Sequence, residues 1–439
     1  MTNTNRLTHV AVDGLFGRHN VELDLVDTTP NAEPRLRIIF DENGRGKTTL
    51  LKMVHHLLSS IDLDVHLMGL AELPIERGRV TIGATVVAFE REVADPRSCT
   101  VSITKGRKHT ALNYDPTRED PRLAARLIVD RAAALSYREE LGALCESPIL
   151  VSDDRVIYGD DILGGRHYGL RPGSLQDARR APTRDPQRVD RRDPSEELRQ
   201  LLATLSQGFL QSAFMNRDPS RTDAVYADML GRIAGGTTVQ SSSDIPALQV
   251  RAQRIDSALG LAERYGLVGL AQLRQVESTL SGLRRNSRNK KTIATVLEPF
   301  FTTLEADVDN FGPVATRIHL LVSTVNSYLR EKEMAYSPAS GLRIVGFDEA
   351  DSQASLDPAQ LSSGERHLLL LFGSAMVADR GRLILIDEPE LSLGISWKRQ
   401  LLRSLLELTE GSQAQFLVAS HSVEVISPYR LSAIALRSD

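Results

Sequence analysis

The chain has 439 residues, a formal net charge of −4 and an apolar fraction of 41%, as in a folded protein with one large domain or two ordinary ones. A net charge this close to zero gives no bulk electrostatic reason to expect nucleic acid or a membrane surface as a partner. No apolar run reaches the roughly 18 residues that span a bilayer, the first residues lack a signal-peptide core, and Cys99 and Cys145 match no zinc-ligand spacing. We therefore expect a cytoplasmic protein with reduced cysteines and no membrane segment.

Residues 1–170 are expected to form the amino-terminal part of an α/β domain. An apolar run that ends at Phe40 is followed by a glycine-containing loop and then by a helix with one apolar face. Alternating apolar and polar residues farther on predict a small antiparallel sheet. The expected elements are strands at Leu7–Val12, Val21–Leu25 and Leu36–Phe40, a helix at Thr48–Leu58, the antiparallel sheet within Arg79–Thr104, a helix at Pro121–Leu144 and a strand at Pro148–Ser152.

Residues 171–335 are expected to form an inserted helical domain. It begins with an exposed linker, 171–193, that is rich in arginine, proline, glycine and aspartate. A helix follows, because Asp193 is suited to cap it, Pro194 to occupy its first turn and Glu196 to complete the cap. Helical spacing of leucine, isoleucine and valine then continues to about Glu333.

Residues 336–439 are expected to return to the α/β domain. The expected elements are strands at Gly341–Gly346, Leu383–Ile386 and Gln415–Ala419 and helices at Leu361–Ala378 and Trp397–Thr409. Short apolar strands that alternate with helices predict a mostly parallel sheet covered on both faces. The pieces of this sheet lie before residue 170 and after residue 340, so the helical part is an insertion between them.

The loop Asp41–Thr48 has the features of a phosphate-binding loop, although an ordinary glycine turn that caps a helix is the alternative. Backbone N–H groups of such a loop surround phosphate oxygens, and the following helix directs the positive end of its dipole toward them. Lys47 is expected to reach the β- and γ-phosphates, and Thr48 to ligate Mg²⁺. Asp41 replaces the usual first glycine, which costs about 1 kcal/mol if its φ is positive. The expected nucleotide-binding residues are Asn43, Gly44, Arg45, Gly46, Lys47, Thr48 and Thr49.

The apolar strand Leu383–Ile386 is followed directly by two acids, Asp387 and Glu388. This is the Walker B arrangement, in which Asp387 holds Mg²⁺ through water and Glu388 orients and deprotonates the attacking water. A strand that ends in two acids is a weak signal alone. Together with the phosphate-binding loop it predicts ATP and Mg²⁺ as ligands.

Two further motifs follow the order found in ABC-type ATPases. Leu361–Glu365 resembles the ABC signature Leu-Ser-Gly-Gly-Gln, and its residues Ser362, Ser363, Gly364 and Glu365 are expected to bind the γ-phosphate presented by a facing subunit. Ser362 and Glu365 also match a helix capping box, and the two interpretations are compatible. His421 comes at the end of the next apolar strand, where ABC heads have the switch histidine that contacts the γ-phosphate.

With four motifs in this order, the chain resembles the soluble ABC-type ATPases of the SMC, RecF and OLD group. It is similar to stand-alone bacterial anti-phage defence ATPases, such as the AriA subunit of PARIS and the PtuA subunit of Septu and retron systems. The resemblance is carried by residues 361–365, 387–393 and 419–422 and implies an ABC-ATPase head, a P-loop NTPase fold, with an inserted helical domain. The chain departs from the family in two ways: no glutamine is available for the Q-loop, and Gly394 stands in place of the D-loop aspartate.

The resemblance implies a slow ATPase with Glu388 and His421 as catalytic residues, which forms dimers or larger homo-oligomers through its heads and controls a separate nuclease or toxin. One alternative is an ATP-locked scaffold with little turnover, which the two departures favour. Another is a DNA-repair ATPase of the SMC or RecF type, which the short insertion argues against. The basic cluster Arg284–Lys291 either contacts nucleic-acid phosphates or forms a solvated turn.

Overall fold

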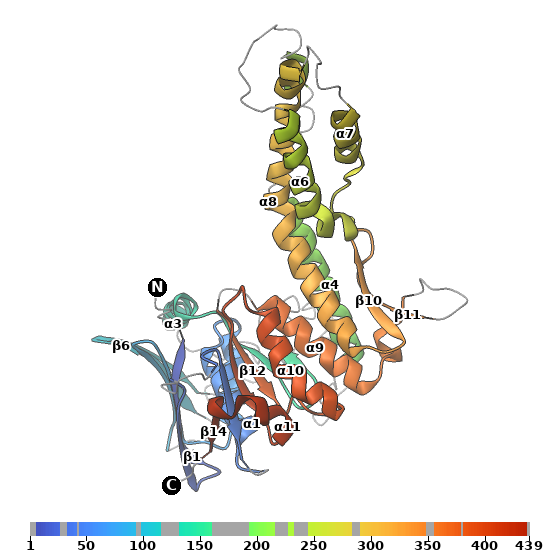
Figure 1. The fold of residues 1–439 in the computed structure, drawn as a ribbon. Helices are drawn as coiled ribbons and strands as arrows, with labels where there is room; N and C mark the ends of the chain where they lie inside the picture. The colour runs from blue at the N-terminus through green and yellow to red at the C-terminus, as the bar shows by residue number, and fades with distance from the viewer. Residues whose placement is uncertain are drawn as a thin grey trace, which may run out of the picture. The chain divides into compact units, whose positions relative to one another are not determined.

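The chain divides into two compact units, and the second is inserted in the sequence of the first. Met1–Leu201 and Asp357–Asp439 make up the first unit, and Leu202–Leu356 makes up the second. The blue amino-terminal and red carboxy-terminal segments therefore share one unit (Figure 1). The computed structural model describes residues 6–26, 33–41, 44–93, 98–115, 131–159, 193–215, 227–231, 245–282, 290–347, 355–378 and 381–436.

Some sequence-based expectations fall outside these ranges. The expected linker up to residue 192 and most of the basic cluster Arg284–Lys291 lie outside the described residues. The domain boundaries after residues 170 and 335 stay a prediction.

The first unit contains a mostly parallel six-stranded sheet. In spatial order its strands are β14 (Ala433–Ala435), β3 (Leu36–Phe40), β13 (Gln415–Ala419), β12 (Leu383–Asp387), β8 (Ile149–Val151) and β9 (Ile157–Tyr158). All neighbours are parallel except β8 and β9. Every residue of β12 and β13 is buried, because these apolar strands are covered on both faces. The predicted α/β head is confirmed, with strands from both ends of the chain in one sheet.

The second sheet is antiparallel and larger than expected. Its strands are, in spatial order, β2 (His19–Asp24), β1 (Leu7–Leu15), β4 (Arg77–Ile82), β5 (Thr85–Arg91), β6 (Cys99–Lys105) and β7 (Lys108–Tyr114). The first two strands belong to it because Val10 pairs with Leu23 on one side and with Val80 on the other. The sequence did not predict β7, since only Leu112 and Tyr114 in this edge strand are buried.

The helices of the first unit lie on both faces of the parallel sheet. One apolar core joins the antiparallel sheet, the helices next to it and one face of the parallel sheet, where Leu385 and Leu417 lie. Helices α9 and α10 lie on the other face (Figure 1), to which Ile384 and Ile386 point because side chains alternate along a strand. The helices are α1 (Lys47–Leu58), α2 (Leu63–Glu72), α3 (Arg131–Leu144), α9 (Ser363–Val377), α10 (Ile395–Leu408) and α11 (Val423–Ile426), with 3₁₀ turns at Pro358–Gln360 and Ser427–Ser432.

The second unit is mainly helical and ends in a hairpin. Its elements are α4 (Pro194–Phe214), which starts in the first unit, α6 (Ile245–Arg264), α7 (Ala271–Gly282), α8 (Lys290–Tyr328), β10 (Lys332–Ser337) and β11 (Gly341–Gly346). Helices α6 and α8 pack side by side (Figure 1). The helical signal expected to run to Glu333 is interrupted earlier, because β10 begins at Lys332 and pairs with β11 in a separate two-stranded sheet. None of the helices in the described parts of the chain combines the length and apolar character needed to cross a bilayer.

Candidate functional site

The phosphate-binding loop joins β3 to α1. Gly44 and Gly46 have φ values of 83° and 90°, a conformation that glycine adopts without steric cost. A Cβ on Gly46 would lie 2.6 Å from a methyl carbon of Leu15, so only glycine lets the loop pack this closely on β1. Helix α1 begins at Lys47, which places the positive end of its dipole in the loop. Arg45 is exposed, Thr48 and Thr49 are half-buried, and Asn43 lies outside the described residues.

Lys47 is held by Asp41, the residue that replaces the usual first glycine of the loop. Its side chain is 5% exposed, and Nζ donates a hydrogen bond of 2.7 Å to the main-chain carbonyl of Asp41. Asp41 does not have a positive φ, so the conformational cost expected at this position does not arise. The substitution of glycine by Asp41 therefore leaves the backbone of the loop unstrained at that residue.

Asp387 ends β12 between β13 and β8, and its environment fits a bound cation. Its side chain is buried, and neither carboxylate oxygen has a hydrogen-bond partner among the described residues. Burial raises the pKa of Asp387 to about 6, which the nearby Thr48 hydroxyl, Lys52 and Lys47 counteract. A buried carboxylate and a hydroxyl are the hard oxygen ligands that Mg²⁺ prefers, and a cation would satisfy the carboxylate. These residues fit the predicted metal site.

Glu388 follows Asp387 and faces the histidine that follows β13. Its φ of 47° is unusual for a residue other than glycine and turns the chain away from the strand. Nδ1 of His421 contacts Oε2 of Glu388. Burial and the neighbouring Glu390 raise the pKa of Glu388 to about 7, against the opposing effect of His421. A carboxylate whose pKa is near neutrality is suited to accept a proton from water.

Glu390 organises the segment that carries His421, and no role was predicted for it from the sequence. One carboxylate oxygen accepts hydrogen bonds from the Ser420 hydroxyl at 2.6 Å and from the main-chain N–H groups of His421 and Ser422 at 3.1 and 3.0 Å. The side chain is 3% exposed. The sequence signal that could have indicated a role for Glu390 is its position, because it closely follows a buried strand. Acids are rarely buried without hydrogen-bonding partners.

Replacing Glu390 with alanine is expected to lower the melting temperature by roughly 5–10 °C, because three donors, two of them buried, lose one charged acceptor. ATP hydrolysis should fall more than ATP binding, since His421 loses its support. Differential scanning calorimetry and phosphate release measure the two effects. Glu410→Ala, at an exposed position, is the control. A Glu390→Ala variant as stable as this control would contradict the role of Glu390.

The signature-like motif forms the capped start of α9. Main-chain N–H of Ser362 donates to Oε2 of Glu365 at 2.8 Å, and Oγ of Ser362 accepts from N–H of Glu365 at 3.2 Å. The predicted capping box is confirmed. The Ser362 side chain is exposed and keeps its own hydroxyl donor for another acceptor. Ser363 is half-buried, and a Cβ on Gly364 would lie 2.6 Å from the carbonyl oxygen of Ser392, so this glycine packs against the loop after β12.

The structure describes the residues at the two expected departures from the ABC pattern, which are the missing Q-loop glutamine and Gly394. Val151 of β8 pairs with Ile386, which brings the residues after β8 close to Asp387, and Asp153 is near enough to raise the Asp387 pKa. Arg155 donates a hydrogen bond of 2.6 Å to the Ser392 hydroxyl. Gly394 is the N-cap of α10 and provides no side-chain cap. Asp153 thus lies near Asp387, Arg155 contacts the loop before α10, and residue 394 in that loop provides no carboxylate.

The carboxyl ends of three adjacent parallel strands bring the first group of predicted residues together. Gly44–Thr49 follow β3, Asp387 and Glu388 end and follow β12, and His421 follows β13. Ligands of open α/β sheets bind at this edge. The residues from Ser362 to Glu365 start α9, on the opposite face of the parallel sheet from α1 (Figure 1).

Residues 161–427, more than half of the chain, match a protein family described as "AAA domain, putative AbiEii toxin, Type IV TA system". A stretch of 86 residues is 26% identical to the dipeptide transport ATP-binding protein DppD of Haemophilus influenzae. This match covers 20% of the chain and only 26% of that protein's length.

The solved structures that are similar to this chain include two Smc head domains. One, from Pyrococcus furiosus, has an extended coiled coil and is bound to the C-terminal domain of ScpA; it is 11% identical, with a TM-score of 0.38, over 99% of this chain and 96% of that one. The other, from Pyrococcus yayanosii, has a coiled coil and joint; it is 12% identical, with a TM-score of 0.36, over 96% and 93%. Because these scores are low, the fold class rests on the strand order described above.

Proposed function

Because the chain belongs to this AAA-domain family, we propose that it binds ATP with Mg²⁺ at the loop between β3 and α1 and hydrolyses ATP with Glu388 as the general base. The observation that carries the proposal is the buried carboxylate of Asp387, which has no hydrogen-bond partner among the described residues and lies beside Thr48. A buried acid without a partner is costly unless a ligand satisfies it. A cation held together with a nucleotide is such a ligand.

Each residue of the site has a defined task in this proposal. Lys47 and the N–H groups at the start of α1 bind the phosphates. Thr48 and Asp387 hold Mg²⁺, which when bound neutralises negative charge on the phosphates. Glu388 accepts a proton from the attacking water, and His421, in contact with Glu388, keeps its carboxylate oriented.

We further propose that two heads complete the site. Ser362 has an exposed hydroxyl at a capped helix start, which is an anion-binding arrangement on the face of the sheet opposite α1. A bound nucleotide brings negative charge to one face of a head, and the helix start of a second head offers partial positive charge to it. ATP is then the link between the two heads.

Replacing Ser362 with arginine is expected to abolish ATP-driven association while a single head still binds ATP. Mixing this variant with Lys47→Ala should restore part of the hydrolysis, because a mixed pair contains one site with an intact Lys47 and an intact Ser362. Sedimentation with ATP and phosphate release from the mixture measure these effects. If Ser362→Arg alone is fully active and a freely exchanging mixture shows no rescue, two heads do not share the site.

Slow turnover is part of the proposal. Gly394 offers no carboxylate, and the sequence between Lys47 and Gln176, which includes Asp153 and Arg155, contains no glutamine. These features also support the second candidate function, an ATP-locked scaffold with little hydrolysis. The intact pair of Glu388 and His421 favours the enzyme.

The partner is proposed from the resemblance to stand-alone anti-phage defence ATPases. In this proposal the cycle of ATP binding and hydrolysis at the heads controls a separate effector, a nuclease or a toxin. Affinity purification of the tagged chain from its host, with Glu388→Gln to hold ATP, tests it. Recovery of an effector with wild-type chain and its loss with Ser362→Arg is the expected pattern.

A further inference from the structure

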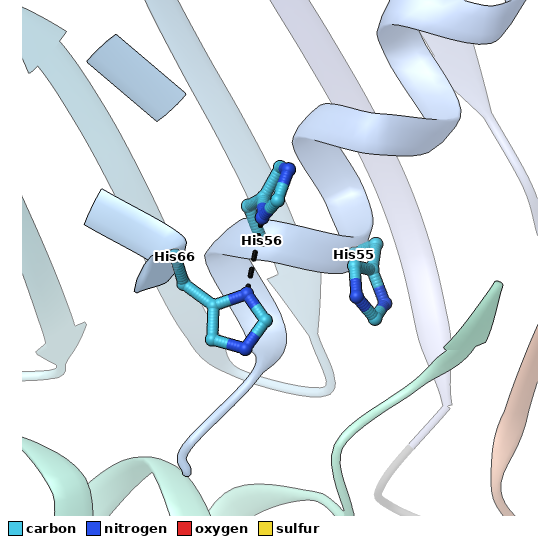
Figure 2. Close-up of side chains that lie close together, drawn as sticks. All are labelled: His55, His56 and His66. Carbon is cyan, nitrogen blue, oxygen red and sulfur yellow. Dashed lines mark hydrogen bonds between the residues drawn. The ribbon is translucent and has the colours of Figure 1, made fainter. Parts of the chain in front are cut away.

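Three histidines with no role in the proposed ATPase site gather in the core of the first unit (Figure 2). His55 and His56 lie in the last turn of α1, and His66 lies in α2. Their exposed fractions are 0%, 7% and 1%. Nδ1 of His56 lies 3.0 Å from Nδ1 of His66, and each histidine offers a ring nitrogen within 4.8 Å of those of the other two. The contact between His56 and His66 is a hydrogen bond, drawn as a dashed line in Figure 2, so one of these two nitrogens presents a lone pair to the other ring.

The spacing of the rings matches coordination of one metal ion. The ring centroids are separated by 5.4 Å for His55 and His56, 5.4 Å for His55 and His66, and 5.3 Å for His56 and His66. A metal–nitrogen bond of about 2.0–2.1 Å and tetrahedral angles place imidazole centroids about 5 Å apart. The nearly equal sides of this triangle are those of three ligands around a common point.

We propose that His55, His56 and His66 bind one divalent transition-metal ion, of the Zn²⁺ type, inside the first unit. Imidazole nitrogen favours Zn²⁺ and similar ions, whereas Mg²⁺ favours the oxygen ligands found at Asp387. All three side chains are buried, and among the described residues they supply three of the four ligands of a tetrahedral site. The ion is separate in position and chemistry from the nucleotide-bound Mg²⁺.

One feature of the surroundings suits a cation. The carboxyl end of α1, where His55 and His56 lie, has the negative end of the helix dipole.

Gly69 of α2 allows this approach. A Cβ on residue 69 would lie 2.5 Å from a ring carbon of His56, so only glycine lets α2 lie directly against that ring. Glycine inside a helix otherwise costs about 1 kcal/mol relative to alanine. The ion would link α2 to the carboxyl end of α1, whose amino end forms the phosphate-binding loop.

The test uses the full chain, stripped of metal by a chelator that binds Zn²⁺ far more tightly than Mg²⁺ and then titrated with Co²⁺. We expect one equivalent of Co²⁺ and the visible absorption of a tetrahedral site. His55→Asn, His56→Asn and His66→Asn should each weaken binding by about 100-fold or more, since even indirect contacts to metal ligands are worth 10–100-fold. His109→Asn, at an exposed position on β7, should bind as the wild type does.

Two further variants keep the test informative if an asparagine variant does not fold. His66→Cys should retain Co²⁺ and add the near-ultraviolet absorption of a sulfur ligand, because thiolate also binds these ions. Gly69→Ala keeps every ligand and should bind Co²⁺ more weakly through the contact with His56. The proposal is overturned if the folded wild-type chain takes up no Co²⁺. It is also overturned if His66→Cys takes up Co²⁺ with the same affinity and the same absorption spectrum as the wild type. Glu388→Gln removes the proposed general base and leaves the three histidines unchanged. The ATPase proposal and the metal proposal can therefore fail independently.

Discussion

Glu388→Gln is expected to lower the rate of ATP hydrolysis by about 10²–10⁴-fold, the usual contribution of a general base. Affinity for ATP and Mg²⁺ should change little, because Lys47, Thr48 and Asp387 are untouched. Glutamine has nearly the same shape but cannot accept the proton from the attacking water. Its contact with His421 can persist as a hydrogen bond, so the segment after β13 is expected to stay in place.

Single-turnover phosphate release and equilibrium binding of ATP, measured on the same preparation, separate the two effects. Glu410→Gln, an exposed change in the same unit, is the matched control. If Glu388→Gln hydrolyses ATP as fast as this control, Glu388 is not the base. If the wild type itself shows no turnover while it binds ATP, the scaffold function replaces the enzyme.

Lys47→Ala is expected to lower the affinity for ATP by well over tenfold, which is more than about 1.4 kcal/mol of binding free energy. The ammonium group lies buried at the start of α1 and donates to the Asp41 carbonyl, so it is already held inside the loop that we propose binds the phosphates. Alanine removes the point charge between the β- and γ-phosphates. Helix α1 should remain, because alanine is the best helix-forming residue.

Isothermal calorimetry with ATP and Mg²⁺ measures this loss, and circular dichroism checks the fold. Lys105→Ala removes an exposed charge from β6 in the same unit and should bind ATP normally. Equal affinity in Lys47→Ala and Lys105→Ala would mean that the loop is not a phosphate site. A loss in both would point to a general effect of charge.

Local features of the sequence predicted most of the first unit. Apolar runs predicted β3, β12 and β13, and the glycine loop before an amphipathic helix predicted α1, because these signals depend on residues that are neighbours in the chain. The same locality predicted the capping box of Ser362 and Glu365. Asp387 and Glu388 were recognisable as site residues because they directly follow a buried strand.

The local sequence signals failed where the pairing of strands with distant or neighbouring segments decided the structure. Strand β7 is an edge strand with a mostly polar sequence. Strand β10 begins at Lys332, just before the helical signal was expected to end, and was not predicted as a strand. Both gain main-chain hydrogen bonds from a neighbouring strand. Helix α2 was not predicted, and Gly69 within it lowers the local helical signal. Tertiary contacts outweigh propensities that differ by less than about 1 kcal/mol per residue.

The sequence by itself therefore determined the class of fold, the glycine loop between β3 and α1, and the position of Asp387 and Glu388 at the end of β12. Only the tertiary structure showed that Glu390 holds the segment of His421 and that His66 joins His55 and His56 in a buried cluster. The physical reason is burial. A charged or polar side chain becomes a site when distant segments exclude water around it and provide its partners, and spacing along the chain does not record which segments those are.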